Sequence, residues 1–249
     1  MIDVTTTAVL RPALLEQTFS SFRRLLFKGY PLRLILNVDR VGSDVATVDD
    51  VLAVARRHFE DVVLLTQGVP NQNTALKAVW SRVESDLFFN LEDDWELFVD
   101  LDFDDMISVM REFPRLASLR LPQNRAVANK CKVYKVCPVS WYFTWNGRYF
   151  EAPPGHAGFF GGVPSLIRAS WMRPILPLVS ADTAVESMCR MLSRRGCPLS
   201  TNWEWGCYTK PGTFRTVAER GKAWRRDAGY RQDDKYHPHG WIRNDAAAH

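Results

Sequence analysis

Three adjacent carboxylates follow an apolar run in this sequence. Residues 88–97 read FFNLEDDWEL, in which Glu92, Asp93 and Asp94 separate two apolar stretches. Carboxylates this close repel one another, and burying them without a partner is costly. One reading is a strand that ends in a surface turn, where acidic residues are common. The other is a site for a divalent cation and the phosphates it carries, because hard cations prefer carboxylate and phosphate oxygens.

The segments around this triplet alternate between expected strands and expected helices. Four apolar segments read as strands (2–6, 32–38, 62–66 and 86–91), and the stretches between them read as helices (12–26, 48–59 and 73–83). Pro12 suits the first turn of a helix, and apolar residues recur at helical spacing after it. The strands are apolar throughout, which is typical of a parallel sheet covered on both faces. The sequence therefore predicts an α/β fold with a mostly parallel central sheet.

Polar side chains lie where three of these strands end. Thr5, Thr6 and Thr7 lie at the end of the first strand, Asp39 at the end of the second, and the acidic triplet at the end of the fourth. In open parallel sheets, ligands bind beyond the carboxyl ends of the strands. We therefore expect these side chains to converge on one edge, which favours the cation and phosphate site over the surface turn.

The second half of the chain is less regular. A helix is expected at 103–113 and a strand at 116–121, followed by a stretch rich in aromatic residues, glycine and proline at 122–163. Residues 180–196 predict a further helix with Ser180 as its N-cap. A basic stretch and the motif HPHGW lie in the last fifty residues.

Composition narrows the class of protein and its partners. The 249 residues, 46% hydrophobic, suit one large domain or a domain with an appendage. A net charge of +4 is too small to indicate a nucleic-acid partner and weakly favours anionic ligands. Five widely spaced cysteines without a CxxC pair argue against a zinc site and predict a reducing cytoplasm. We expect no signal peptide and no transmembrane segment, because no stretch approaches the roughly 20 apolar residues of a span.

Taken in order, these features resemble a known enzyme family. The matching motifs are VTTTAVLRPALLEQTFSSF (4–22), LILNVD (34–39), NQNTALKAVW (71–80), FFNLEDDWE (88–96) and GGVPSLIRASWM (161–172). Their order resembles that of an inverting GT-A glycosyltransferase, close to glycosyltransferase family 2, with Glu92-Asp93-Asp94 standing where the family has its DxD element. The resemblance spans residues 2–217 and is more specific in its first half.

The resemblance implies a GT-A, Rossmann-like fold with a mostly parallel sheet and helices on both faces. Residues 1–100 would form the nucleotide-sugar-binding half of a single domain, and residues 101–217 its acceptor half. Residues 218–245 would form a C-terminal extension. The last four residues, 246–249, resemble a cloning remnant and are left out of the fold prediction.

The implied activity is that of an inverting, hexosyltransferase-type enzyme. It would move a sugar from a nucleotide-sugar donor to a hydroxyl of a carbohydrate or glycoconjugate acceptor. A divalent cation, Mn²⁺ or Mg²⁺, would offset the charge of the leaving diphosphate. By resemblance, Asp94 would bind this metal, and Glu92 or Asp93 would contact the ribose. Residues i and i+2 of an extended segment point the same way, so Glu92 can share the metal with Asp94.

The resemblance also assigns residues to the nucleotide. Asp39 would accept the imide N–H of the base, which points to a uracil nucleotide. Thr6 and Arg11 would lie near the nucleotide, although Arg11 reads equally well as an exposed charge at the start of a helix.

One position departs from the family pattern. The family usually has a His-x-Gly motif after its last strand as a further metal ligand, and here CYTKPGTFRTV (207–217) has Lys210 at that place. A protonated lysine cannot bind a metal, but Lys210 and Arg215 can neutralise the diphosphate directly. Alternatively, His237 or His239 completes the metal site.

Inversion requires a general base that takes the proton of the acceptor hydroxyl. The resemblance places this base at the start of the helix after the PSLIR segment, where Asp182 and Glu186 lie one turn apart on one face. Asp182 also suits a first-turn charge favoured by the helix dipole, so Glu186 is the expected base.

Aromatic residues are candidates for the acceptor site, because the C–H faces of sugars pack on aromatic rings. The candidates are Trp141, Trp145, Trp203 and Trp205, and each reads as a core residue as well. His156, in GHAGFFGG, reads either as a contact to the acceptor or diphosphate or as a plain loop residue.

Two other functions stay open. A nucleotidyltransferase shares the sheet and the acidic metal site, but it would usually carry a glycine-rich, basic phosphate loop after the first strand. TTTAVLRPA (5–13) has no glycine. A catalytically silent carbohydrate-binding relative is the other alternative, because Lys210 stands in place of the family's histidine.

Overall fold

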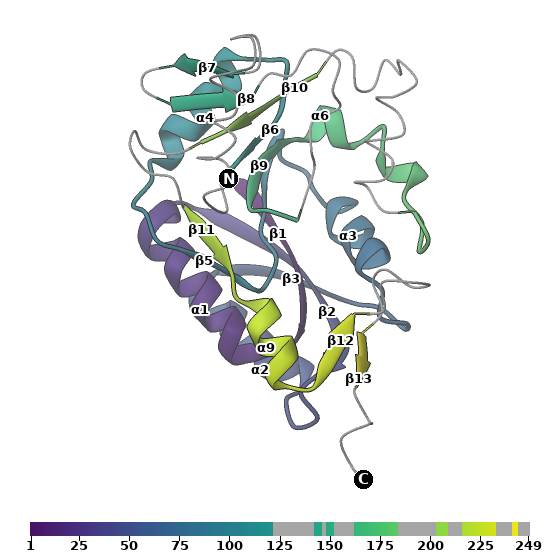
Figure 1. Ribbon diagram of the computed structural model, residues 1–249. Coiled ribbons are helices and arrows are strands. Elements are labelled where there is room, and N and C mark those ends of the chain that lie inside the picture. The colour runs from purple at the N-terminus through teal and green to yellow at the C-terminus, as the bar shows by residue number, and fades with distance from the viewer. Residues whose placement is uncertain are drawn as a thin grey trace.

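A seven-stranded sheet forms the centre of the computed structural model (Figure 1). The structure describes residues 1–121, 142–145, 148–151, 162–183, 203–208, 216–232 and 241–243. The strand order is β10-β6-β9-β4-β1-β2-β3. The strands are β1 (Ile2–Leu10), β2 (Leu32–Gly42), β3 (Asp61–Thr66), β4 (Leu87–Asn90), β6 (Leu116–Arg120), β9 (Ser165–Arg168) and β10 (Glu204–Cys207). Only β9 runs antiparallel to its neighbours in this sheet, so the predicted mostly parallel sheet is confirmed.

Helices cover both faces of the sheet, as the apolar strands predict. On one face, α1 (Pro12–Phe22), α2 (Val48–His58) and α4 (Phe103–Glu112) pack against the larger core cluster. On the other face, α3 (Gln72–Trp80) and α6 (Ala169–Met172) pack against a second cluster built around Trp80 and Trp171. Strands buried between two such layers have no polar face, which explains their continuous apolar runs.

The helices of the first half begin where local sequence signals favour a helix. Pro12 occupies the first turn of α1, and a π-helical turn (Arg23–Phe27) continues that helix. Thr47 and Asp50 form a capping box at the start of α2. The side chain of Asn71 caps α3 by accepting from the backbone N–H of Thr74 at 3.0 Å. The predicted helices of this half are thus confirmed, each within a few residues.

The end of the chain returns to the first half. Strand β11 (Val217–Glu219) pairs antiparallel with β5 (Trp95–Leu97), which directly follows the acidic triplet (Figure 1). Helix α9 (Gly221–Asp227) comes next, followed by β12 (Tyr230–Gln232) and its partner β13 (Trp241–Arg243). The predicted boundary at residue 217 falls within β11.

The second half of the chain is described in part. A hairpin joins β7 (Tyr142–Trp145) and β8 (Arg148–Glu151), and a 3₁₀ turn spans Leu176–Leu178. The prediction that Ser180 caps a helix is wrong: residues 180–183 form a turn closed by a Ser180–Thr183 bridge. The rest of that predicted helix lies outside the described residues. Within the described ranges, no helix is both long and apolar enough to span a membrane.

Candidate active site

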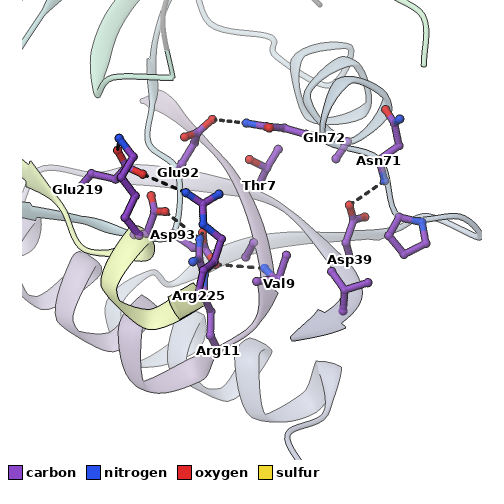
Figure 2. Close-up of a pocket in the computed structure, with 16 residues that line it drawn as sticks. Thr7, Val9, Arg11, Asp39, Asn71, Gln72, Glu92, Asp93, Glu219 and Arg225 are labelled. Atoms are coloured by element: carbon purple, nitrogen blue, oxygen red, sulfur yellow. Dashed lines mark hydrogen bonds and ion pairs between the residues drawn. The ribbon is translucent and has the colours of Figure 1, made fainter. Parts of the chain in front are cut away.

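A cavity of about 500 Å³ opens at the carboxyl edge of the sheet (Figure 2). Its lining comes from the ends of β1 and β2, the start of α3, the acidic triplet and the segment that holds β11 and α9. Glu92, Asp93 and Asp94 all line it, together with Asp39. The predicted convergence of strand-end side chains on one edge is therefore confirmed for these four acidic residues.

Buried hydrogen bonds hold the strand that leads into the triplet. The side-chain oxygen of Asn90, the last residue of β4, accepts from Thr5 Oγ1 and from Trp80 Nε1, each at 3.1 Å. The N–H of Leu91 donates to the carbonyl of Thr5 at 2.9 Å. These bonds connect the end of β4 to β1 and α3. They thereby fix the start of the turn that holds the acidic triplet, whose residues line the cavity.

Arg11 is bound by two of the three carboxylates. Its Nε and Nη2 lie 2.8 Å and 2.5 Å from Oδ2 and Oδ1 of Asp93, and Nη2 lies 3.0 Å from Oδ2 of Asp94. Arg11 is only 5% exposed, so its reading as an exposed charge at a helix start is wrong. Burial opposes the charge of Arg11, but the two carboxylates outweigh burial and raise its pKa.

Positive charge only partly compensates the carboxylates of Glu92 and Asp94. Glu92 accepts from Gln72 Nε2 at 3.0 Å. Burial, followed by the charges of Asp94 and Asp93, raises the pKa of Glu92. Burial likewise raises the pKa of Asp94 despite its contact with Arg11, and Oδ1 of Asp94 is buried without a hydrogen-bond partner in the described part of the chain. An additional cation would offset both penalties.

Asp39 lies across the cavity from the triplet. Its Oδ1 accepts from Asn37 Nδ2 at 2.9 Å, and its Oδ2 accepts from the backbone N–H of Asn71 at 3.1 Å. Burial raises the pKa of Asp39, although both hydrogen bonds act in the opposite direction. Each carboxylate oxygen has a second lone pair, so Asp39 can still accept a hydrogen bond from a ligand.

The end of β11 and the start of α9 supply three charged residues that were not predicted from the sequence. Glu219, Lys222 and Arg225 line the cavity. The backbone N–H of Arg220 donates to the carbonyl of Asp94 at 2.7 Å, which holds this segment on the triplet. Only the basic run GKAWRR marks it in the sequence, and a basic run is usually a solvated surface.

Thr6 does not reach the cavity, contrary to the prediction. Val4 and Ala8 on either side of it belong to the core beneath α1, and alternate residues of a strand share a face. Thr6 is therefore fully buried in that layer, while Thr7 lines the cavity instead.

Of the predicted acceptor-side residues, Asp182 is described and exposed. It follows Ala181, whose carbonyl accepts from Asn73 Nδ2 at 2.8 Å and from Asn71 Nδ2 at 3.3 Å. Asp182 thus lies next to the cavity rim that Asn71 forms. Trp203 is partly buried against the second core cluster, in line with its reading as a core residue. The other predicted residues have side chains outside the described part of the chain: Trp141, Trp145, His156, Glu186, Trp205, Lys210, Arg215, His237 and His239.

Two carboxylates of the cluster could serve as ligands for a cation. Among the described residues, no three His, Cys, Asp or Glu side chains form a group that could hold a metal ion. Glu92 and Asp94 fit a cation that takes its remaining ligands from phosphate and water, as Mg²⁺ commonly does. The carboxylate of Asp93 is engaged by Arg11 and by the N–H of Val9 at 3.1 Å.

Sequence comparisons identify no relative, since no protein-family profile and no curated protein match the chain. Solved structures do match. The mannosyltransferase PcManGT from Pyrobaculum calidifontis, solved with GDP-Man and Mn²⁺, has a TM-score of 0.50 and 12% identity, over 87% of this chain and 56% of its own. TarS from S. aureus has a TM-score of 0.55 and 7% identity, over 92% of this chain and 39% of its own. The chain has a GT-A fold.

The GT-A fold places the acidic triplet after β4, at the sheet edge where the cavity opens. At these identities the likeness extends to the fold and no further. UDP-glucose pyrophosphorylase also matches, with a TM-score of 0.51 and 10% identity, over 92% of this chain and 97% of its own. The GT-A fold by itself therefore does not separate the glycosyltransferase from the nucleotidyltransferase alternative.

Proposed function

We propose that this chain is an inverting glycosyltransferase that uses a UDP-linked sugar donor and a divalent cation. One observation carries the proposal: Glu92 and Asp94 share a cavity with Asp39 at the carboxyl edge of the sheet. A nucleotide sugar needs a partner for its base at one end and a cation for its diphosphate at the other. Asp39 would accept the imide N–H of uracil, and Glu92 or Asp93 would contact the ribose.

The excess of acidic side chains in the cavity supports the binding of a divalent cation. Five acidic side chains line it (Asp39, Glu92, Asp93, Asp94 and Glu219) against three basic ones (Arg11, Lys222 and Arg225). A diphosphate would be repelled by such a lining unless a further positive charge is present. Glu92 and Asp94 would hold Mn²⁺ or Mg²⁺, which supplies charge neutralisation of the leaving diphosphate. Arg11 would keep the carboxylates of Asp93 and Asp94 in place and is a positioning residue.

Inversion in one step needs a base on the acceptor side. The acceptor oxygen forms its bond to the anomeric carbon while the bond from that carbon to the diphosphate breaks, and the base takes the hydroxyl proton. We propose Glu186 for this role. Asp182 is the alternative, supported by its exposed place beside the rim residue Asn71.

The start of α1 favours glycosyl transfer over nucleotidyl transfer. Strand β1 runs to Leu10 and α1 begins at Pro12, so Arg11 alone lies between them. A nucleotidyltransferase would usually cradle phosphates in a glycine-rich loop at this point, and a single residue engaged by two aspartates leaves no such loop. The acceptor would be a carbohydrate or glycoconjugate, and the cysteine pattern supports a cytoplasmic setting.

One assay separates the candidate functions. Purified protein is incubated with UDP-sugars and Mn²⁺, with and without inorganic pyrophosphate. A glycosyltransferase releases UDP and free sugar by slow hydrolysis without an acceptor. When a suitable glycan acceptor is added, UDP is released faster and the sugar is transferred to the acceptor. A nucleotidyltransferase forms UTP and sugar 1-phosphate only with pyrophosphate. A silent carbohydrate-binding protein forms none of these products, and glycans raise its melting temperature.

A further inference from the structure

Two basic side chains reach the acid cluster from α9. Lys222 and Arg225 lie three residues apart, a spacing that places them on the same face of the helix, and both line the cavity. Their neighbour Arg226 does not line it and pairs with Asp227 at 3.0 Å. Within the cavity-lining pair, the side chain of Arg225 is 18% exposed, whereas that of Lys222 is 72% exposed.

Both cavity-lining cations of α9 form ion pairs with Glu219, and Figure 2 shows the pair with Arg225. Its Oε2 lies 3.0 Å from Nζ of Lys222, and its Oε1 lies 3.6 Å from Nη2 of Arg225. Its carboxylate also lies among like charges: after burial and the nearer carboxylates, Glu219 adds to the raised pKa of Glu92 and of Asp94. This acid thus satisfies two cations and repels two carboxylates of the same cavity.

The approach of α9 to the cluster depends on a glycine. A Cβ at Gly221, the first residue of α9, would lie 1.9 Å from Oδ2 of Asp94. The ring centroid of Trp224 lies 5.6 Å from the guanidinium carbon of Arg11. Helix α9 is therefore packed directly against Asp94, one of the two residues proposed to bind the cation, and against Arg11.

Building on the proposed function, we propose that Lys222 and Arg225 bind the diphosphate of the donor, and that Glu219 occupies the place of a phosphate until the donor arrives. A diphosphate offers these cations more charge and more acceptor oxygens than one carboxylate does. Donor binding then exchanges one anion for another, and Glu219 opposes it by competing for the cations and by repelling the phosphates. The sequence predicts the same role for Lys210 and Arg215, which lie outside the described residues.

The test measures binding of UDP in the presence of Mn²⁺ by titration calorimetry. We expect Lys222→Ala and Arg225→Ala each to weaken binding about ten- to a hundredfold, the usual effect of losing a charge-assisted hydrogen bond. Arg226→Ala is the matched control and should leave the affinity unchanged. Glu219→Gln should tighten binding several-fold, because it removes the competing charge. Gly221→Ala should weaken binding, whereas Gly68→Ala should not, because a Cβ at Gly68 meets no atom within 4 Å.

Three outcomes would overturn the inference. If Glu219→Gln weakens UDP binding as strongly as Lys222→Ala, Glu219 supports the site and is not a competitor. If the wild type binds UDP and the Lys222 and Arg225 variants bind it equally well, the phosphates lie elsewhere and only this inference fails. If the wild type binds neither UDP nor UDP-sugars with Mn²⁺, the proposed function fails as well. Circular dichroism of each variant separates lost binding from lost folding, and Arg225→Lys tests whether charge alone restores affinity.

Discussion

Arg11 forms a bidentate ion pair with the carboxylate of Asp93, which lies 82 positions away in the sequence. Its Nε lies 2.8 Å from Oδ2 and its Nη2 lies 2.5 Å from Oδ1. Both side chains are at most 5% exposed. The pair joins the start of α1 to the turn after β4, and through Nη2 it also reaches Asp94. It stabilises the geometry of the cavity and neutralises part of the negative charge of the acidic triplet.

Removing Arg11 should therefore destabilise the protein. Arg11→Met leaves Asp93 and Asp94 buried without their cation, and breaking a buried pair in this way typically costs roughly 3–5 kcal/mol. Arg11→Lys keeps the positive charge but loses the bidentate geometry of the guanidinium group, so the free energy of unfolding should decrease less. Urea unfolding measures both. Mn²⁺ should restore part of the stability of Arg11→Met, because the released carboxylates become ligands. An unfolding free energy for Arg11→Met equal to that of the wild type would refute the structural role.

Asp94→Asn should abolish transfer and keep the fold. The variant loses a proposed metal ligand, and metal assistance contributes several kcal/mol to such reactions, so we expect turnover to fall about a hundredfold or more. Stability should change little, because the substitution also relieves repulsion from the neighbouring carboxylates. Turnover with a UDP-sugar and the melting temperature are measured together. Asp49→Asn, on the exposed face of α2, is the control. Near-normal turnover of Asp94→Asn would show that the metal assignment is wrong.

The identity of the base is tested by a matched pair of variants. Glu186→Gln keeps the shape of the side chain but cannot accept a proton, so kcat should fall on the order of 10²–10⁴-fold. The Kd for the donor should stay the same, because the base serves the acceptor. Asp182→Asn should have a much smaller effect. The reverse result would move the base to Asp182, and full activity of both variants would remove the support for an inverting mechanism.

Asp3 makes stability depend on pH in the acid range. Burial favours the neutral form, but hydrogen bonds from Arg33, Ser85 and Glu84 together outweigh burial and lower the pKa of Asp3 below 3.8. The contacts include Arg33 Nε at 2.7 Å and the N–H of Glu84 at 2.8 Å. Since the folded state has the lower pKa, the stabilisation is fully present above the ordinary pKa and is lost as pH falls through the folded value.

Asp3→Asn should accordingly lower the free energy of unfolding by about 1.5–3 kcal/mol at neutral pH, the usual contribution of a hydrogen bond to a charged group. The difference from the wild type should shrink as pH falls below 4 and the wild-type carboxylate becomes protonated. Urea titrations at several pH values measure this. A difference that stays constant across the acid range would mean that Asp3 acts through packing and not through its charge.

The helices and main strands of the first hundred residues, and the place of the acidic triplet, could be predicted from local sequence signals. These depend on local causes: Pro12 starts α1, Thr47 and Asp50 cap α2, and apolar runs mark strands buried on both faces. A parallel sheet then brings every strand end to one edge, so Asp39 and the triplet could be expected to meet.

The side chains that complete the cavity depend on long-range packing and could not be predicted from the sequence. The strand register turns Thr7 toward the cavity and Thr6 into the core, and the neighbouring threonines carry no local signal of that choice. Pairing of β11 with β5 brings Glu219 and α9 onto the triplet from more than a hundred residues away. A charged residue in a sequence reads as solvated until a distant partner is known. For this reason Arg11 read equally well as an exposed charge, and Lys222 and Arg225 were not predicted at all.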